Sequence, residues 1–184
     1  MKYLYIVLSA GIFVLAGCQP KTPKTAEQIL EQAGQNPAMN AGAGKYTFTT
    51  PEGWKRMDTT MQNIQFTYLF APVEAKVAFH PNINIGTEDM RGVSMDDYFD
   101  KNVGQMKQFM QNFTVGAQSA RATNGNKLKI QEYSHSMSGI DMDVSMAVIP
   151  KNGIAYIITL TTEKGHRGDY QKEFDEVVNS FTVN

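Results

Sequence analysis

Apolar side chains recur at every third or fourth position in two stretches of the chain. The first stretch contains Met95, Tyr98, Phe99, Val103, Met106 and Met110, and the second contains Tyr170, Phe174, Val177, Val178 and Phe181. This spacing lines them up along one side of an α-helix. Ser94 and Asp97 can cap the first helix, because a serine in this position accepts hydrogen bonds from first-turn amides. The pattern predicts a helix of about four turns after Ser94 and a second helix after Gly168 or Asp169.

Three turn dipeptides divide the segment between these helices. They are Asn124-Gly125, Ser138-Gly139 and Asn152-Gly153, and each combines residues that tolerate the positive φ of a tight hairpin. We therefore expect an antiparallel meander of four strands, near residues 113–122, 127–137, 140–149 and 154–162.

Further strand candidates precede the first helix. Tyr46 and Phe48 alternate with threonines before the turn-forming run 51–54, and residues 64–70 and 77–85 carry two more apolar runs. Two helices on a mostly antiparallel sheet make an α+β layered domain.

The second of these apolar runs has two special features. Pro81 should interrupt the strand or confine it to an edge, because proline cannot donate a ladder hydrogen bond. Asn82 and Asn84 alternate with isoleucines, so we expect one apolar face and one wet face.

The start of the chain has the pattern of an export signal. Lys2 precedes an apolar run over residues 3–14, and the tetrapeptide Leu-Ala-Gly-Cys follows at 15–18. The run is too short to span a membrane and ends in small residues, as a cleaved signal does. The tetrapeptide resembles the lipobox of bacterial lipoproteins. We predict a lipoprotein signal peptide over residues 1–17, with Cys18 as the lipidated first residue of the mature protein.

Composition then divides the rest of the chain in two. Residues 18–44 are rich in Gln, Pro, Thr, Ala and Gly, and they predict a lipidated cysteine followed by a flexible tether. Residues 45–184 have the length of one globular domain. Gln19 lacks the acidic character of an inner-membrane retention signal, so we expect an outer-membrane, periplasm-facing protein of the cell envelope.

Charge and cysteine content narrow the function further. The chain has 18 acidic and 17 basic residues, so there is no basic excess to bind nucleic acid. Cys18 is the single cysteine, and lipidation would leave the mature domain no thiol for a disulfide, a nucleophile or a thiolate metal site.

The order of elements resembles the PsbP-like superfamily, which includes bacterial DcrB-like lipoproteins. The resemblance covers residues 45–184: an aromatic first strand that breaks at Pro51, Gly53 and Trp54, a central helix, a long meander, and a last helix ending in Ser180 and Phe181. It implies an α/β/α sandwich and a non-catalytic role in docking onto other proteins. No site residue is carried over from the superfamily.

One face of the central hairpin carries candidate metal ligands. If Ser138-Gly139 is the turn, His135 pairs with Met142 and Met137 with Ile140, and the shared face carries His135, Met137, Met142 and Met146. Imidazole and thioether ligands suit Cu(I). The alternative is that these side chains pack beneath a helix, as methionines commonly do.

The opposite face of the hairpin is acidic. Asp141 and Asp143 lie there with Ser134 and Ser136, and they could hold a hard cation such as calcium or form an ordinary solvated face. The trio His135, Ser136 and Asp141 has the residue types of a hydrolase triad. Neighbouring residues of a strand point to opposite faces, which argues against a relay from Ser136 to His135.

The remaining candidates are isolated side chains. Trp54, Tyr68 and Phe70 could line a ligand groove, but aromatic residues in strand patterns favour the core. His80 and His166 are expected at the surface or in turns.

These observations predict a non-enzymatic, membrane-anchored lipoprotein that binds or supports another envelope protein and needs no cofactor. The alternative function is a periplasmic module that binds a small ligand or copper, and a hydrolase that uses Ser136 is a formal third option.

Overall fold

The computed structural model describes residues 46–61, 64–72 and 78–184 of the chain. In chain order, the elements are β1 (Tyr46–Thr47), β2 (Lys55–Met61), β3 (Ile64–Phe70), β4 (Asn82–Asp89), α2 (Met95–Phe109), β5 (Gln111–Thr123), β6 (Asn126–Met137), β7 (Ile140–Lys151), β8 (Ile154–Glu163), the 3₁₀ turn η1 (Arg167–Tyr170), α3 (Gln171–Ser180) and β9 (Thr182–Val183). The expected signal peptide, the lipidated Cys18 and the tether lie outside the described residues.

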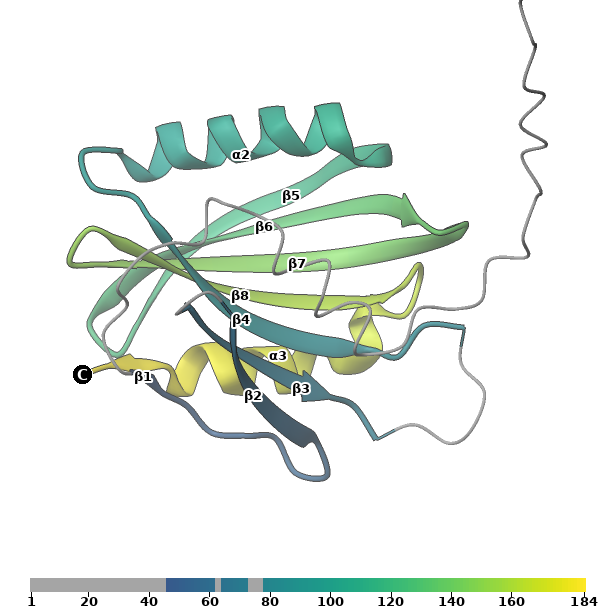
Figure 1. Cartoon of the computed structure of the whole chain (residues 1–184), viewed down its shortest axis with the longest axis horizontal. Helices are drawn as coiled ribbons and strands as arrows, with labels where there is room; N and C mark the ends of the chain where they lie inside the picture. Colours follow the sequence, from purple (N-terminus) through teal and green to yellow (C-terminus); the bar gives the residue numbers. More distant parts are fainter. Residues whose placement is uncertain (1–45, 62–63, 73–77) are drawn as a thin grey trace, which may run out of the picture.

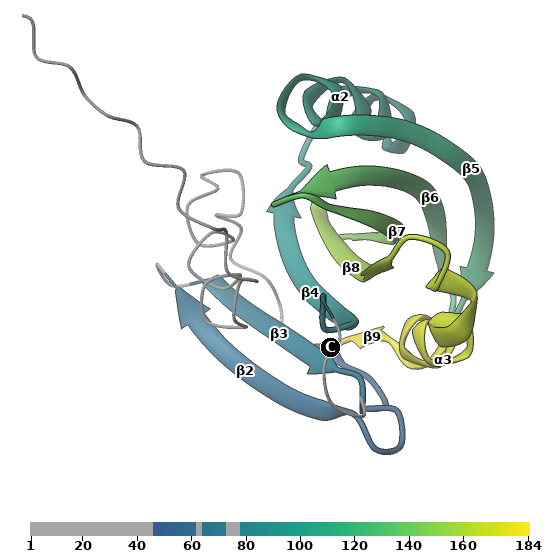
Figure 2. The same ribbon diagram turned by 90° about the vertical axis from the view of Figure 1, so that its right-hand side faces the viewer.

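Seven strands form one antiparallel sheet in the order β2-β3-β4-β8-β7-β6-β5, and β1 pairs with β9 beside it (Figure 1). The side chains of β7 alternate between the two faces of the sheet. Ala147 and Ile149 join a core cluster with α3, whereas Met146 and Val148 join a second cluster with α2. The two helices therefore cover opposite faces (Figures 1 and 2), and the predicted α/β/α sandwich is confirmed.

The three predicted hairpin turns are present. Asn124 and Gly125 have φ of 48° and 74°, and the other two dipeptides likewise have positive φ at both residues. A turn with this geometry matches the right-handed twist of the strands that it connects. The four strands of the meander, β5 to β8, extend only slightly beyond their predicted bounds.

Both helices also lie where the sequence predicts them. The backbone N–H of Asp97 donates to Ser94 Oγ at 3.1 Å, which caps the first turn of α2. Tyr98 and Phe99 of α2 are buried, as are Phe174, Val177 and Val178 of α3. Neither helix has the length and apolar character that crossing a bilayer requires.

The strand predicted at residues 77–85 is shifted along the chain. The observed strand β4 begins at Asn82 and lies inside the sheet, between β3 and β8. Pro81 precedes it, and its carbonyl accepts a hydrogen bond from the Ala71 N–H at 3.0 Å. The expected wet face is also wrong for Asn82, which is 3% exposed and donates through Nδ2 to the His80 carbonyl.

Strand β2 has no counterpart among the predicted elements. Its sequence, KRMDTTM, lacks the apolar alternation that marks a half-buried strand. Among the strands that the structure describes, it lies at the edge of the sheet and pairs with β3 alone. Edge strands commonly carry charged and polar side chains, so this composition suits its position.

Candidate functional site

The hairpin of β6 and β7 has the predicted register. His135 lies opposite Met142, and Met137 lies opposite Ile140. These side chains share the face that α2 covers, since Tyr133 and Val144, the next pair on that face of the hairpin, belong to the cluster under that helix. The expected arrangement of imidazole and thioethers on one face is therefore present.

The four candidate metal ligands differ in their surroundings. Met142 is fully buried and Met146 is 6% exposed, whereas His135 and Met137 are half-buried. Met146 lies four residues beyond Met142 on β7, about 13 Å along an extended strand. His135, Met137 and Met142 lie within two positions of one another on the hairpin, whereas Met146 lies too far along the strand to share an ion with them.

The environment of His135 favours the neutral imidazole. Burial lowers the pKa of His135, because the charged form loses hydration. Its ring also lies 6.0 Å from the Tyr133 ring, which in turn contacts Phe113. A neutral imidazole is the form that binds metals, and metal binding at this face stays a prediction.

The opposite face of the hairpin has the expected acidic cluster. Ser134 Oγ donates to Asp143 at 2.6 Å, and Ser136 Oγ donates to Asp141 at 2.5 Å. Asp143 also accepts the Gly165 N–H at 2.9 Å. Each carboxylate is thus held by its own serine. Within the described part of the chain, no three His, Cys, Asp or Glu side chains are grouped so that they could hold an ion.

The hydrogen bonds at Asp143 change its acidity. Burial alone would raise the pKa of Asp143. The hydrogen bonds from Ser134 and Gly165, with the nearby charges of Arg167 and Lys164, outweigh burial and lower the pKa below its ordinary value. The carboxylate is ionised at neutral pH and acts as an acceptor.

The trio of hydrolase residue types is not assembled into a relay. Ser136 accepts a hydrogen bond from Asn112 Nδ2 at 2.9 Å and donates to Asp141. His135 belongs to the other face of the same strand. A polar hollow of about 290 Å³ lies at this end of the hairpin, and its lining includes His135, Ser136, Asp141 and Lys164.

Trp54, Tyr68 and Phe70 are buried, as expected of core residues. Trp54 belongs to the cluster beneath α3, where its ring meets Tyr170 edge-on at 6.0 Å. Tyr68 and Phe70 point to the other face of the sheet, because Leu69 between them faces α3. The three aromatic side chains therefore do not line one groove.

The two remaining histidines are exposed, as the sequence predicts. His80 Nε2 lies 2.7 Å from the Ala71 carbonyl oxygen, and its ring meets Phe70 edge-on. His166 Nδ1 lies 2.9 Å from Asp169 Oδ2, three residues along the chain. Both imidazoles have local structural partners.

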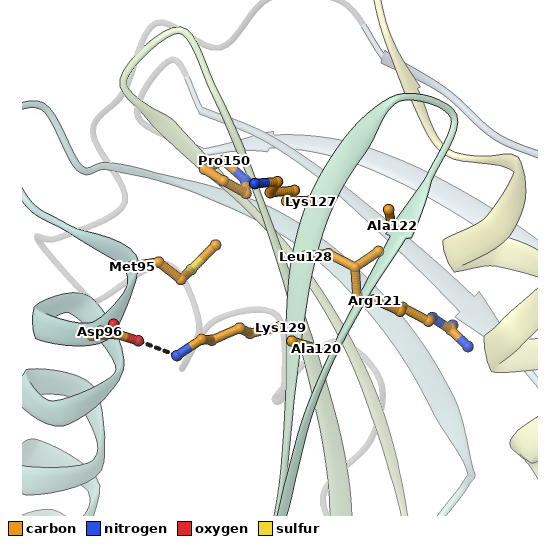
Figure 3. Close-up of a pocket in the computed structure, with 9 residues that line it drawn as sticks. All are labelled: Met95, Asp96, Ala120, Arg121, Ala122, Lys127, Leu128, Lys129 and Pro150. Atoms are coloured by element: carbon orange, nitrogen blue, oxygen red, sulfur yellow. Dashed lines mark hydrogen bonds and ion pairs between the residues drawn. The ribbon is translucent and has the colours of Figure 1, made fainter.

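A second pocket, which the sequence did not indicate, lies between the start of α2 and the strands β5, β6 and β7 (Figure 3). Its volume is about 530 Å³. The lining residues are Met95, Asp96, Ala120, Arg121, Ala122, Lys127, Leu128, Lys129 and Pro150. In the sequence, Ala120 and Ala122 before the Asn124-Gly125 turn and Lys127 and Lys129 after it occupy alternate positions, which places the four side chains on one face of a hairpin. Only the packing of α2 against the sheet turns these residues into a pocket.

Solved structures share this fold at low sequence identity. PA94 of Pseudomonas aeruginosa, a protein of unknown function, is 13% identical, with coverage of 78% of this chain and 99% of PA94 and a TM-score of 0.59. LpqN of Mycobacterium tuberculosis, described as involved in cell envelope biogenesis, is 12% identical, with coverage of 89% and 99% and a TM-score of 0.59. CyanoP, the cyanobacterial PsbP of Synechocystis sp. PCC 6803, is 16% identical, with coverage of 81% and 97% and a TM-score of 0.52.

At these identities the likeness concerns the fold. None of the curated proteins matches the chain significantly. The family model of PsbP, however, matches residues 40–183, a span that includes every described helix and strand. The chain therefore belongs to the PsbP family.

Proposed function

We propose that this protein is a lipid-anchored, non-enzymatic accessory protein of the bacterial cell envelope that binds another envelope protein. Two observations support the anchor and its location. The tetrapeptide ending at Cys18 has the lipobox pattern, and the fold is similar to that of LpqN, which is described as involved in cell envelope biogenesis. The diacylglyceryl group on Cys18 holds the domain at the membrane, where two acyl chains give stable binding.

The observation that carries the non-enzymatic part of the proposal is the separation of the reactive side chains on the β6–β7 hairpin. Ser136 and Asp141 bond to each other on one face, and His135 lies on the other face. A nucleophile needs a base within hydrogen-bond reach. The hairpin therefore stabilises the fold and leaves Ser136 without an activating imidazole.

The anchor determines where the domain works. Gln19, directly after the lipidated cysteine, favours sorting to the outer membrane, and the folded domain then faces the periplasm. The partner is a protein of the same compartment. Its binding needs no cofactor of this chain.

The test is crosslinking in intact cells, followed by purification of the tagged protein and mass spectrometry. A Cys18→Ala variant expressed at the same level is the matched control, since it keeps the domain and loses the lipid. We expect one dominant crosslinked partner that is lost in the control. A partner set that is the same in both proteins, or a turnover activity of the purified protein that one substitution abolishes, would contradict the proposal.

A Cu(I)-binding function is the second candidate. The observation that favours it is the cross-strand pair His135–Met142, with Met137 beside them on the same face. Thioethers are soft ligands of the kind that Cu(I) prefers, and a neutral imidazole also binds copper.

A further inference from the structure

The pocket at the start of α2 has one apolar surface and one cationic surface. Ala120 lies opposite Lys129, and Ala122 lies opposite Lys127, so that these four side chains share one face of the β5–β6 hairpin. It is the face that α2 covers, because Lys129 pairs with Val148 of the cluster beneath that helix. The short alanine side chains leave the space that longer residues would fill.

The walls of this pocket are mainly apolar. Met95 of α2 points toward the hairpin, and Pro150 closes the far end beside Lys127 (Figure 3). Leu128, which is 2% exposed, contributes to the lining from its place in the core. A volume of about 530 Å³ falls within the range of small-molecule sites, which are typically apolar with a few polar groups.

The cations of the pocket are not equivalent. Lys129 forms an ion pair with Asp96 and lies over the Phe99 ring, 5.9 Å from its centroid. Arg121 points away from the pocket and pairs with Asp175 at 2.7 Å (Figure 3). The side chain of Lys127 has no ion pair or hydrogen bond to any residue that the structure describes. Lys127 is therefore the one lining cation whose charge is not compensated within the described domain.

We infer that this pocket binds a small amphipathic anion, namely a free medium-chain carboxylate. The apolar body of the ligand packs against Met95, Ala120 and Ala122, and the carboxylate pairs with Lys127. Burial of the ligand methylenes away from water supplies most of the affinity. The ammonium group selects the anion over a neutral molecule of the same length. This site is independent of the proposed protein partner.

The experiment is a titration of the full, lipidated chain in phosphatidylcholine nanodiscs with octanoate, followed by NMR of labelled Met and Ala methyl groups. We expect saturable shifts at Met95, Ala120 and Ala122, with no comparable shifts in the methionines of the β6–β7 hairpin. Unmoved methyl resonances in the pocket would overturn the inference, and the crosslinking result described above would stand unaffected.

Two substitutions on neighbouring residues of β5 localise the binding. Ala120→Phe fills the pocket and should abolish the shifts at Met95 and Ala122. Ser119→Phe is the matched control, because Ser119 is exposed and pairs with Ile130 on the opposite face of the sheet. Equal binding by the two variants would overturn the assignment to this pocket.

The charge of the ligand is tested separately. Lys127→Gln should weaken octanoate binding about two- to fivefold, which is the range of an exposed ion pair. Octan-1-ol should bind to the unchanged protein more weakly than octanoate by the same factor. Equal affinity for the acid and the alcohol would overturn the role of Lys127. Pocket shifts caused by phosphatidylglycerol nanodiscs without octanoate would assign the site to a membrane headgroup and overturn the free carboxylate.

Discussion

Glu88 of β4 is a carboxylate held between the sheet and helix α2. Tyr98 of α2 donates its hydroxyl hydrogen to Glu88 Oε2 at 2.6 Å. Burial raises the pKa of Glu88, and the hydrogen bond from Tyr98 and the charge of Lys101 oppose this rise only in part. The native protein therefore binds a proton at Glu88 more tightly than the unfolded chain does.

The sign of the resulting pH dependence follows from this shift. An unfolded glutamate titrates near pH 4.3, roughly the ordinary value. The stabilising contribution of Glu88 is complete below that pH and is lost as the pH rises through the higher native pKa. We predict that Glu88→Gln, which keeps an acceptor for Tyr98, removes this loss.

Chemical denaturation of both proteins between about pH 4 and pH 7 measures the effect. Relative to the wild type, the variant should gain free energy of unfolding as the pH rises. Asp58 and Asp143 have lowered pKa values and act with the opposite sign, but they are present in both proteins and cancel in the difference. A difference that does not change with pH would show that Glu88 is not perturbed.

Met142 separates the two interpretations of the methionine face. Met142 is fully buried, so an alanine there would cost about 2–5 kcal/mol and obscure any loss of metal binding. Met142→Leu removes the thioether at nearly constant volume, at a cost below about 1.5 kcal/mol. If the Cu(I) site exists, Met142→Leu should weaken Cu(I) binding at least tenfold, because one of three ligands is lost. Competition with a chromogenic chelator under reducing conditions measures this affinity.

Met146→Leu is the control for this measurement. Its side chain has the same chemistry but lies about 13 Å from Met142 along β7. It should leave Cu(I) affinity unchanged. Equal effects of the two leucine variants, or the absence of tight binding by the wild type, would leave these methionines as core residues alone.

At the scale of the element, the backbones of strands β5 and β6 approach each other closely at Gly116. A Cβ atom at this position would lie 3.0 Å from the Glu132 carbonyl oxygen and 3.1 Å from Glu132 Cβ. Since a backbone atom is involved, β5 would have to move. We predict that Gly116→Ala lowers the free energy of unfolding by about 1–3 kcal/mol, the usual cost of overpacking.

Gly104→Ala is the matched substitution in helix α2. A Cβ atom there meets nothing within 4 Å, and alanine is favoured over glycine in a helix by about 0.5–1 kcal/mol. Urea unfolding should show one variant destabilised and the other stabilised. If Gly116→Ala raised the urea midpoint as much as Gly104→Ala does, β5 would relax away from Glu132 without cost, which would contradict the prediction.

The elements differ in how far the sequence determines them. Hairpins such as Asn124-Gly125 could be predicted because turn chemistry and strand alternation are local. Strand β2 could not, because an edge strand carries few apolar residues. The start of β4 was misplaced because Ala78 and Phe79, the described apolar residues before Pro81, have strand composition but no partner in the ladders that β4 forms with β3 and β8.

The candidate sites also differ in how far the sequence predicts them. The pairing of His135 with Met142 and the opposite acidic face could be predicted, since both follow from one turn and the alternation of a strand. The apolar pocket could not, because Asp96 and Lys129 on its two walls are 33 residues apart in the chain. It depends on how α2 packs against the sheet.

At the scale of the whole molecule, the two ends of the described chain lie together. Tyr46 of β1 pairs with Val183 of β9, and both side chains pack against the cluster that contains α3. The chain from the proposed anchor therefore joins the domain on the side of α3. The pocket at the start of α2 lies on the other face of the sheet (Figures 1 and 2).

The proposal that this PsbP-family domain works from a lipid anchor is tested most directly by intact mass spectrometry of the protein extracted from membranes. We predict a chain that begins at Cys18 and carries a diacylglyceryl group, whereas the Cys18→Ala variant keeps residues 1–17 and gains no lipid mass. A wild-type chain with an unmodified Cys18, or one cleaved elsewhere and found outside the membrane fraction, would contradict the lipid anchor.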